Sequence, residues 1–397
     1  MPLVDMKDML DHAYEHGYAV GSFDVVSLDF LQGVVDAAER SRAPIILSLA
    51  ESHFDHYDFE LLMAAVERAA ERAEVPVAVL LDHGGSHEMA VRGINLGCNG
   101  VMIDASHLEL SENINLTRQV VETAHACGVA VEGELGYVPG VEGEDAERHP
   151  GEISFTTVAT ARGYVEHTGV DCLAVSVGTV HGNFRGKARL DFTRLKQINS
   201  AVRIPLVIHG GTGLSEDQFR RLIANGVAKI NYYTALSDAA ADAVRSAVRG
   251  KQHGGITGLT RHVREAVCAE AERCIRLWGA TGRAAEVFSR CRPWQPVEHV
   301  ILYNTAEVER EGAALMQAEG QRVLSRIPGV RRVFSGDAVQ EKAGYRHAWV
   351  IRFAHPKVID SYRDHPDHVE FANRRFRPLA GDRVSIDYLG GDRPEQP

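Results

Sequence analysis

The stretch Leu206-Val207-Ile208-His209-Gly210-Gly211-Thr212-Gly213 joins an apolar run to a histidine and a glycine-rich loop. The same pattern returns at Leu80-Leu81-Asp82-His83-Gly84-Gly85 and at Gly178-Thr179-Val180-His181-Gly182. Imidazole is the commonest metal ligand at neutral pH, and three imidazoles leave a fourth position open, as in catalytic zinc sites. One such histidine could simply satisfy hydrogen bonds at a strand end. Three in the same context favour a single divalent metal site.

Short apolar runs like these alternate with stretches of helical spacing over the first 290 residues. Near-continuous apolar runs are typical of parallel strands buried on both faces. The expected strands are residues 19–24, 44–50, 77–82, 100–105, 129–135, 172–177, 205–209 and 228–232. Eight strand–helix units predict a (β/α)8 TIM barrel, in which active-site residues follow the carboxyl ends of the strands. His83, Glu134, His209 and Asn231 occupy such positions, with His181 slightly beyond a fifth strand.

A break with two prolines, Pro293 and Pro296, ends this pattern. After it we expect strands at 297–303, 330–334, 346–353 and 384–388, with helices at 307–326, 356–364 and 369–376. Prolines after a glycine-bearing turn are typical of a linker. We therefore divide the chain into an α/β barrel (1–290), a linker (291–296) and a smaller α+β domain (297–391).

The composition favours a soluble cytoplasmic protein. A formal net charge of −11 opposes binding to nucleic acid, and no apolar run is long enough to cross a membrane. The first 17 residues lack the basic start and apolar block of a signal peptide. The six cysteines form no C-x-x-C pair, which indicates reduced thiols.

Two side chains suggest competing chemistries. Asp82 directly precedes His83, and a turn at the strand end would let both face the pocket. Its carboxylate could shuttle a proton to a developing alkoxide, or it could orient a histidine. Lys229, near the end of the last barrel strand, could instead form a Schiff base and cleave carbon–carbon bonds without metal.

The loop at 210–213 precedes Ser215, a good N-cap for a following helix. Backbone amides there could cradle a phosphate, since barrels often bind phosphate at their seventh and eighth loops. Glu132 and Glu134 share one face of a strand, where a charge needs a metal or a partner. Glu142 lies in the acidic loop that follows, which is either a lid carrying a base or a solvated surface loop.

Five ordered motifs resemble the class II, zinc-dependent ketose-bisphosphate aldolases of the fructose and tagatose type. The motifs are Asp82-His83-Gly84, Val101-Met102-Ile103-Asp104-Ala105-Ser106, Glu132-Gly133-Glu134-Leu135-Gly136, Val180-His181-Gly182 and His209-Gly210-Gly211-Thr212-Gly213. The resemblance implies reversible cleavage of a ketose bisphosphate, or a related ketose phosphate, to dihydroxyacetone phosphate and an aldehyde. A dication would stabilise the intervening enediolate.

The resemblance also implies roles for individual residues. His83, His181 and His209 match the zinc ligands, Asp104 and Glu134 match a second or displaced metal position, Asp82 matches the proton donor and Glu142 matches the base. The residues that match the substrate site are Ser52, Gly182, Gly210, Gly211, Thr212, Asn231, Tyr232, Tyr233 and Thr234. A monovalent cation, Na⁺ or K⁺, often assists there through backbone carbonyls.

The chain departs from the family at two places. Glu51-Ser52-His53-Phe54-Asp55-His56-Tyr57 stands where the family has a Ser-x-Gly-Ala-x-Lys-Tyr-like segment, so bulky and acidic residues replace small and basic ones. Pro139-Gly140 replaces a Gly-Gly before the loop glutamate, and Gly143 replaces an acidic residue. The first segment faces the aldehyde half, which leaves the aldehyde and its phosphorylation open.

The tail resembles the stress-responsive dimeric α/β barrel domains, which are ferredoxin-like. The match rests on Glu298-His299-Val300, Ile327-Pro328-Gly329-Val330 and the segment from Tyr362 through His368 to Phe371. Such domains usually dimerise through their sheets, which predicts a homo-oligomer, a dimer or tetramer. A few are cyclases that use residues matching Tyr362 and His368. The alternative for the whole chain is an inactive metal-binding barrel that acts as a scaffold or sensor through its tail.

Overall fold

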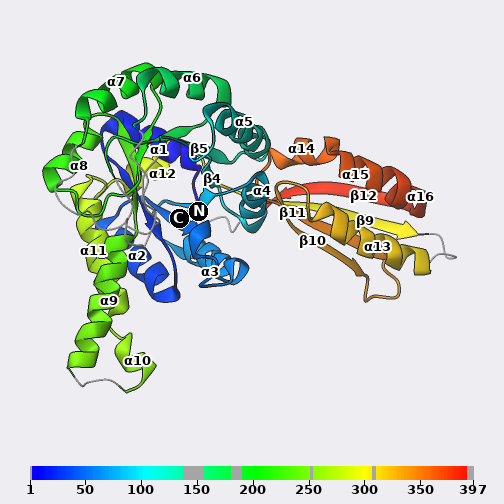
Figure 1. Ribbon diagram of the computed structural model, residues 1–397. Coiled ribbons are helices and arrows are strands. Elements are labelled where there is room, and N and C mark those ends of the chain that lie inside the picture. Colours follow the sequence, from blue (N-terminus) through cyan, green and yellow to red (C-terminus); the bar gives the residue numbers. More distant parts are fainter. Residues whose placement is uncertain (1, 137–154, 180–189, 251–253, 306–309, 391–397) are drawn as a thin grey trace.

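The computed structural model describes residues 2–136, 155–179, 190–250, 254–305 and 310–390. Its first part is a closed barrel of eight parallel strands in the order of the chain (Figure 1). The strands are β1 (Val20–Asp24), β2 (Ile45–Ala50), β3 (Val77–Gly84), β4 (Gly100–Ile103), β5 (Ala130–Leu135), β6 (Cys172–Val175), β7 (Leu206–Ile208) and β8 (Val227–Tyr232). The predicted TIM barrel is thereby confirmed, with strand ends shifted by one or two residues.

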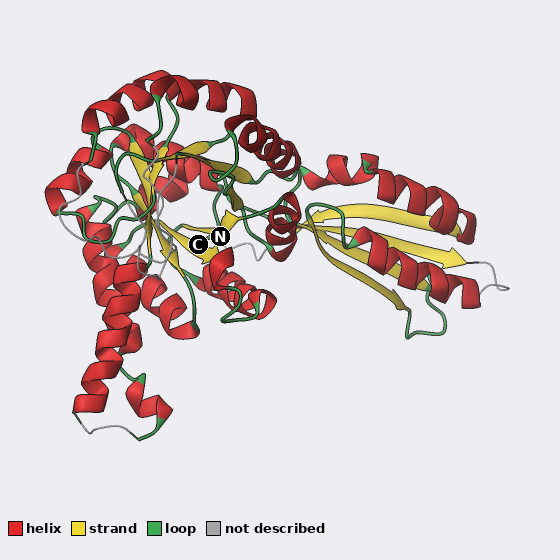
Figure 2. Cartoon of the chain, viewed as in Figure 1, coloured by secondary structure: helices red, strands yellow, loops and turns green. Residues whose placement is uncertain are grey.

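Helices surround the barrel as an outer layer, except that a short helix and the end of the helix before it project away from the barrel (Figure 2). They are α1 (Met6–His16), α2 (Leu28–Ser41), α3 (Phe59–Arg72), α4 (His87–Leu96), α5 (Leu110–Ala126), α6 (Val158–Thr168), α7 (Phe192–Val202), α8 (Glu216–Ile223), α9 (Thr234–Arg249), α10 (Ile256–Leu259), α11 (Val263–Leu277) and α12 (Ala284–Arg290). Ser215 caps α8 as predicted, in a capping box with Gln218. No helix among the described residues is long and apolar enough to cross a membrane.

Strand register explains why polar groups gather inside the barrel. In a parallel pair, residues that lie opposite each other face the same side of the sheet, and the side alternates along each strand. Ser22 lies opposite Asn231, Asp24 opposite Ser48, and Ala50 opposite Asp82. Asn231 bonds to Asp82 inside the barrel, so these positions all face inward. The interior therefore becomes polar toward the carboxyl ends of the strands.

The second part of the chain is a four-stranded antiparallel sheet with helices against it. Its strand order is β10-β11-β9-β12. This antiparallel sheet agrees with the ferredoxin-like fold predicted for the tail. The strands are β9 (Val297–Thr305), β10 (Val330–Asp337), β11 (His347–Phe353) and β12 (Ala380–Leu389), and the helices are α13 (Arg310–Leu324), α14 (Val358–Asp364), α15 (Pro366–Phe371) and α16 (Arg377–Leu379). A π-helical turn at Ala372–Phe376 joins α15 to α16, where the sequence predicts one helix.

The sheet and its helices pack against the barrel at α3, α4 and α5. Arg331 of β10 makes two hydrogen bonds of 2.8 Å to Glu67 of α3 and one of 3.0 Å to the Leu96 carbonyl. Asn95 of α4 accepts a 2.8 Å bond from the Gly329 amide, and its own amide donates to the Ile327 carbonyl. These hydrogen bonds attach the start of β10 and the turn before it to helices α3 and α4 of the barrel.

Gly329 lies at the contact between the two parts. A side chain there would come within 2.5 Å of Val358 and 3.0 Å of Cys127, and the φ of 82° is left-handed. Glycine is therefore required at this contact. The proline-bearing linker adds a second contact, because the Trp294 ring stacks on His355 with centroids 4.6 Å apart.

We predict that Arg331→Met destabilises the protein by about 2 kcal/mol at pH 7, because it leaves a half-buried carboxylate without its charged partner. Burial alone would raise the pKa of Glu67, but the hydrogen bonds and charge of Arg331 hold that pKa below its usual value. The stabilisation is therefore present above the ordinary glutamate pKa and is lost as the pH falls through the lowered value.

Urea unfolding of the wild-type protein and of Arg331→Met, at pH 7 and near pH 4, measures the difference in their free energies of unfolding. Arg68→Met is the control, since Arg68 pairs with Glu71 on the exposed face of the same helix, α3. An equal loss of stability in both variants at pH 7 would contradict a structural role for Arg331.

Candidate active site

Two of the predicted metal-ligating histidines meet at the carboxyl ends of β3 and β7. The Nε2 atom of His83 lies 3.0 Å from Nδ1 of His209. One ligand atom from each of Asp82, His83 and His209 lies within 4.8 Å of the others. His181, the third predicted ligand, lies outside the described residues, as do Gly182 and Glu142.

A turn at His83 brings both Asp82 and His83 into the site. His83 has a φ of 48°, in the left-handed region that a non-glycine residue rarely occupies, and the β3–β4 register shifts between Leu81 and Gly84. Strain of this kind persists where the surrounding structure holds it, commonly at functional sites. The turn that the sequence permits after Asp82 is therefore present, and it brings the consecutive side chains of Asp82 and His83 into one cluster with His209.

Carboxyl groups surround His83 on its other side. Its Nδ1 atom lies 2.8 Å from Asp104, which also accepts a 2.8 Å hydrogen bond from the Ser106 hydroxyl. His83, Asp104 and Glu134 form a second group able to hold a metal. Burial lowers the pKa of His83, but the charges of Asp82 and Asp104 outweigh it and raise that pKa well above the usual value. The carboxyl groups around His83 therefore create a local negative potential that favours a positive charge.

Glu134 and His209 respond to burial in opposite ways. Burial, reinforced by the charge of Asp104, raises the pKa of Glu134 well above its usual value. Burial and the neighbouring His83 lower the pKa of His209, so its imidazole is neutral. One oxygen of Glu134 has no hydrogen-bond partner among the described residues. A neutral imidazole and an unpartnered carboxyl oxygen are both able to accept a cation.

A buried ion pair lies directly beneath these groups. Glu132 and Lys229 are both 0% exposed, and their charged atoms are 2.8 Å apart. Glu132 also lies 2.9 Å from Nε2 of His209, and Lys229 donates a 2.5 Å bond to Asn231. Asn231 in turn donates a 2.8 Å bond to Asp82. The partner charge predicted for Glu132 is therefore that of Lys229. The ion pair orients His209 through Glu132, and it orients the Asp82 carboxylate through Lys229 and Asn231.

This pairing argues against a Schiff base on Lys229. Burial alone would lower the pKa of Lys229, but Glu132 and Asp82 outweigh that effect and raise it. A Schiff-base lysine must lose its proton to become a nucleophile. Lys229 is instead held as an ammonium ion within a hydrogen-bonded network.

The predicted substrate residues divide by where their side chains lie. Thr212 and Asn231 are buried, and Gly210 has a left-handed φ of 69° at the start of the loop after β7. The Tyr232 hydroxyl donates to Glu270 of α11 and its ring packs on Trp278, so this side chain lies outside the barrel. Ser52 is exposed on a 3₁₀ turn (Glu51–His53).

Tyr233, Thr234 and Gly211 complete this side of the barrel. The Tyr233 ring lies 4.6 Å from that of His53, which brings the loops after β8 and β2 together. Thr234 is buried at the start of α9. A side chain at Gly211 would lie 3.4 Å from Ile230 and Phe219, so the loop runs close to the barrel wall.

Sequence reasoning did not identify Asp24 as a site residue, and it named Tyr57 only as the last residue of the segment expected to face the aldehyde. Both contribute buried oxygens near the carboxyl ends of β1 and β2 that have no hydrogen-bond partner among the described residues. The available signal was an acidic residue closing an otherwise apolar strand, Val20-Gly21-Ser22-Phe23-Asp24.

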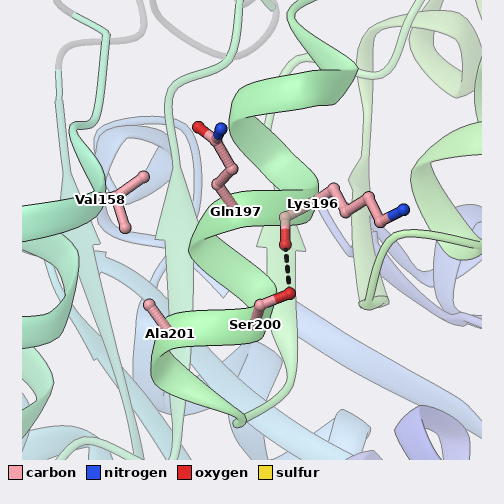
Figure 3. Close-up of a pocket in the computed structure, with 5 residues that line it drawn as sticks. All are labelled: Val158, Lys196, Gln197, Ser200 and Ala201. Carbon is pink, nitrogen blue, oxygen red and sulfur yellow. Dashed lines mark hydrogen bonds between the residues drawn. The ribbon is translucent and has the colours of Figure 1, made fainter.

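A shallow groove between α6 and α7 lies on the outer surface and carries no comparable chemistry (Figure 3). It is lined by Val158, Lys196, Gln197, Ser200 and Ala201. The only hydrogen bond drawn among them joins the Ser200 hydroxyl to the Lys196 carbonyl of the same helix. Charged groups therefore converge at the barrel mouth and not in this groove.

Comparison with known proteins identifies the family of each part of the chain. Residues 4–283 match the family model for class-II fructose-bisphosphate aldolase, and residues 297–389 match that of the stress responsive A/B barrel domain. A fructose-bisphosphate aldolase of Geobacillus stearothermophilus is 38% identical over 291 residues, which are 72% of this chain and 100% of the relative. A probable fructose-bisphosphate aldolase of Bacillus subtilis is 40% identical over 254 residues, 63% of this chain and 88% of the relative.

Solved structures give the same result. The YdjI aldolase of Escherichia coli K12 has a TM-score of 0.64 at 34% identity, covering 71% of this chain and 99% of that one. A putative fructose-1,6-bisphosphate aldolase from Coccidioides immitis has a TM-score of 0.64 at 31% identity, covering 70% and 97%. The chain belongs to the class II fructose-bisphosphate aldolase family. It is a class II aldolase, a carbon–carbon lyase, that carries a C-terminal stress-responsive A/B barrel domain.

We predict that Lys229→Met lowers the free energy of unfolding by about 3–5 kcal/mol, because it leaves the Glu132 carboxylate buried without its cation. The control, Lys196→Met on the exposed face of α7, should change stability by less than about 0.5 kcal/mol. Urea unfolding followed by circular dichroism measures both.

Borohydride treatment with dihydroxyacetone phosphate tests the same ion pair chemically. The wild-type protein should gain no mass, because the ammonium form of Lys229 cannot attack a carbonyl. A stable adduct on Lys229, or equal stability of the two methionine variants, would contradict the buried ion pair.

Proposed function

We propose that this aldolase uses zinc to cleave a ketose phosphate reversibly into dihydroxyacetone phosphate and an aldehyde. The substrate is fructose or tagatose 1,6-bisphosphate or a related ketose phosphate, and the role is in carbohydrate metabolism such as glycolysis. The convergence of Asp82, His83 and His209 at the mouth of the barrel carries the proposal. A catalytically inactive scaffold does not account for the consecutive inward aim of Asp82 and His83, which requires a strained backbone.

The donor set fits a zinc ion. We assign His83 and His209 as ligands together with His181, and Asp104 and Glu134 as a second or displaced position. Nitrogen ligands with one position left open are typical of catalytic zinc. Bound zinc would supply a Lewis acid that stabilises negative charge developing on the substrate. The raised pKa of His83 and the unpartnered Glu134 oxygen both reflect an electrostatic environment that favours a cation.

The protein's own groups position the substrate and move its protons. Asn231 holds one oxygen of Asp82, and the other oxygen is buried with no partner among the described residues. That free oxygen suits Asp82 to carry a proton to the aldehyde oxygen. We assign Glu142 as the base that removes the proton next to the ketone.

We place the phosphate of dihydroxyacetone phosphate at the loops after β6, β7 and β8. Its contacts would come from Gly182, Gly210, Gly211, Thr212, Asn231, Tyr232, Tyr233 and Thr234, with Tyr232 acting through its backbone. A Na⁺ or K⁺ ion bound by backbone carbonyls would assist there. Ser52 would serve the aldehyde side. Backbone amides at a helix start suit an anion, and α8 begins directly after this loop.

We assign assembly to the C-terminal domain. One face of its sheet packs on helices, since the Trp349 ring contacts Phe371. The opposite face carries Phe334, Val350, Val300 and Ile386 in one row across all four strands. Phe334 and Ile386 are each 44% exposed. An apolar row on an open sheet face suits contact with a second copy, so we propose a homo-oligomer, a dimer or tetramer.

Tyr362 and His368 lie on the covered side of the same domain. Their rings are 4.3 Å apart, and Tyr362 is buried. We propose that they pack the core of an assembly domain. We also propose the domain division 1–290, 291–296 and 297–391, and residence in the cytoplasm, where the six free cysteines would stay reduced.

Cleavage of fructose and tagatose 1,6-bisphosphates by the zinc-loaded full chain tests the function. We expect activity that is lost on exhaustive chelation and restored by zinc. Asp82→Asn should lower kcat by about 10²–10⁴, because the amide cannot deliver a proton. The same variant should still exchange the proton of dihydroxyacetone phosphate with solvent, because that step does not need the aldehyde.

Different results of these experiments would contradict different parts of the proposal. Activity that survives chelation would refute the zinc mechanism. Loss of both proton exchange and cleavage in Asp82→Asn would show that Asp82 does more than protonate the aldehyde oxygen. Asp36→Asn, which removes a carboxylate from α2 outside the barrel, is the control for changed charge.

Phe334→Glu should halve the molecular mass measured by light scattering, because a charge in the apolar row opposes its burial. Val339→Glu is the control, since Val339 is 93% exposed in the turn between β10 and β11. An unchanged mass in Phe334→Glu, or an equal loss in Val339→Glu, would contradict assembly through the sheet.

A further inference from the structure

A buried carboxyl group lies at the end of β1, with no partner in the part of the chain that the structure describes. Asp24 is 0% exposed, and neither of its side-chain oxygens has a hydrogen-bond partner among the described residues. The hydroxyls of Ser48, on the adjoining strand, and of Tyr57, in the segment after that strand, are buried and unpartnered in the same way. Three polar side chains from neighbouring segments are thus buried without satisfying one another.

Strand register places this group beside the catalytic aspartate. Asp24 lies opposite Ser48, and two residues further along β2 Ala50 lies opposite Asp82. The side chains at these positions point into the barrel, so Asp24, Ser48 and Asp82 follow one another across β1, β2 and β3. Because Asp82 is the proposed proton donor to the aldehyde oxygen, the wall formed by β1 and β2 adjoins the aldehyde half of the substrate.

The segment after β2 forms the rest of this wall. Glu51 accepts a 2.7 Å hydrogen bond from the Gly85 amide, which ties the segment to the loop that carries His83. Burial raises the pKa of the Tyr57 phenol, and the charge of Asp24 adds to the effect, so the two groups are close enough to interact. In the part of the chain that the structure describes, no lysine or arginine pairs with Asp24 or Glu51.

The energetics of this wall discriminate between aldehydes. A carboxyl group buried without a partner costs several kcal/mol, and a ligand hydroxyl that donates to it recovers part of that cost. A phosphate group at the same place would instead meet an acidic wall that has no paired cation among the described residues, and like charges at short range repel strongly. Contact with this wall therefore strengthens the binding of a hydroxyl-bearing aldehyde and weakens the binding of a phosphorylated one.

We propose that Asp24, Ser48 and Tyr57 form the aldehyde subsite and select an unphosphorylated aldehyde that carries hydroxyl groups. The cleaved ketose is then a 1-phosphate without a second phosphate at its far end. This inference rests on the proposed aldolase function and narrows its substrate class.

The test is condensation of dihydroxyacetone phosphate with glyceraldehyde and with glyceraldehyde 3-phosphate, using the zinc-loaded full chain. We expect kcat/KM to be at least roughly tenfold higher with glyceraldehyde. A preference for glyceraldehyde 3-phosphate would overturn the inference. Exchange of the dihydroxyacetone phosphate proton with solvent, measured without any aldehyde, tests the proposed function separately, because it does not involve this subsite.

Asp24→Asn provides the decisive variant, since it removes the negative charge at nearly constant volume. The ratio of kcat/KM for glyceraldehyde to that for glyceraldehyde 3-phosphate should fall by roughly tenfold. Asp36→Asn removes the same charge outside the barrel and should leave that ratio unchanged. An unchanged ratio in Asp24→Asn would refute the subsite.

Tyr57→Phe provides a second readout, which does not depend on Asp24→Asn folding correctly. Loss of one hydroxyl without loss of charge should raise KM for glyceraldehyde more than it lowers kcat, because the hydroxyl binds the aldehyde and takes no part in proton transfer. No change in KM would remove Tyr57 from the subsite and contradict the proposal as stated.

Discussion

The buried ion pair between Glu132 and Lys229 is the interaction on which the barrel mouth depends. A closed barrel of this size is filled by side chains, and charges inside it must be compensated where they lie. Glu132 contacts His209 and Lys229 contacts Asn231, so one pair sets the position of the imidazole proposed as a metal ligand and of the amide that holds Asp82. The interior charges thus serve stability and geometry together.

The barrel itself was predictable from the sequence because its signals are local. Apolar runs such as 77–82 and 205–209 identify the strands, and histidines followed by glycine identify the carboxyl ends at which His83 and His209 meet. The resemblance to class II aldolases could be stated for the same reason. These features depend on neighbouring residues along the chain.

Partners across the barrel were not predictable, because they depend on register between strands far apart in sequence. Nothing near Lys229 indicates that Glu132 neutralises it from 97 positions away. Nothing near Asp24 in the sequence indicates that it lies opposite Ser48 and has no hydrogen-bond partner among the described residues. The expected helix at 369–376 is divided by a π-helical turn, and Phe376 of that turn contacts Tyr303 of the sheet, a contact that local propensity does not encode.

The contact between the barrel and the sheet makes each unit part of the other's core. The apolar core runs without interruption from the barrel, through Trp294, to Val330 and Val358 of the smaller domain. A barrel separated from its sheet would expose apolar surface around Cys127 and lose the partner of Glu67. The two units therefore depend on each other for burial and charge pairing, so a substitution on either side of the contact changes the stability of both.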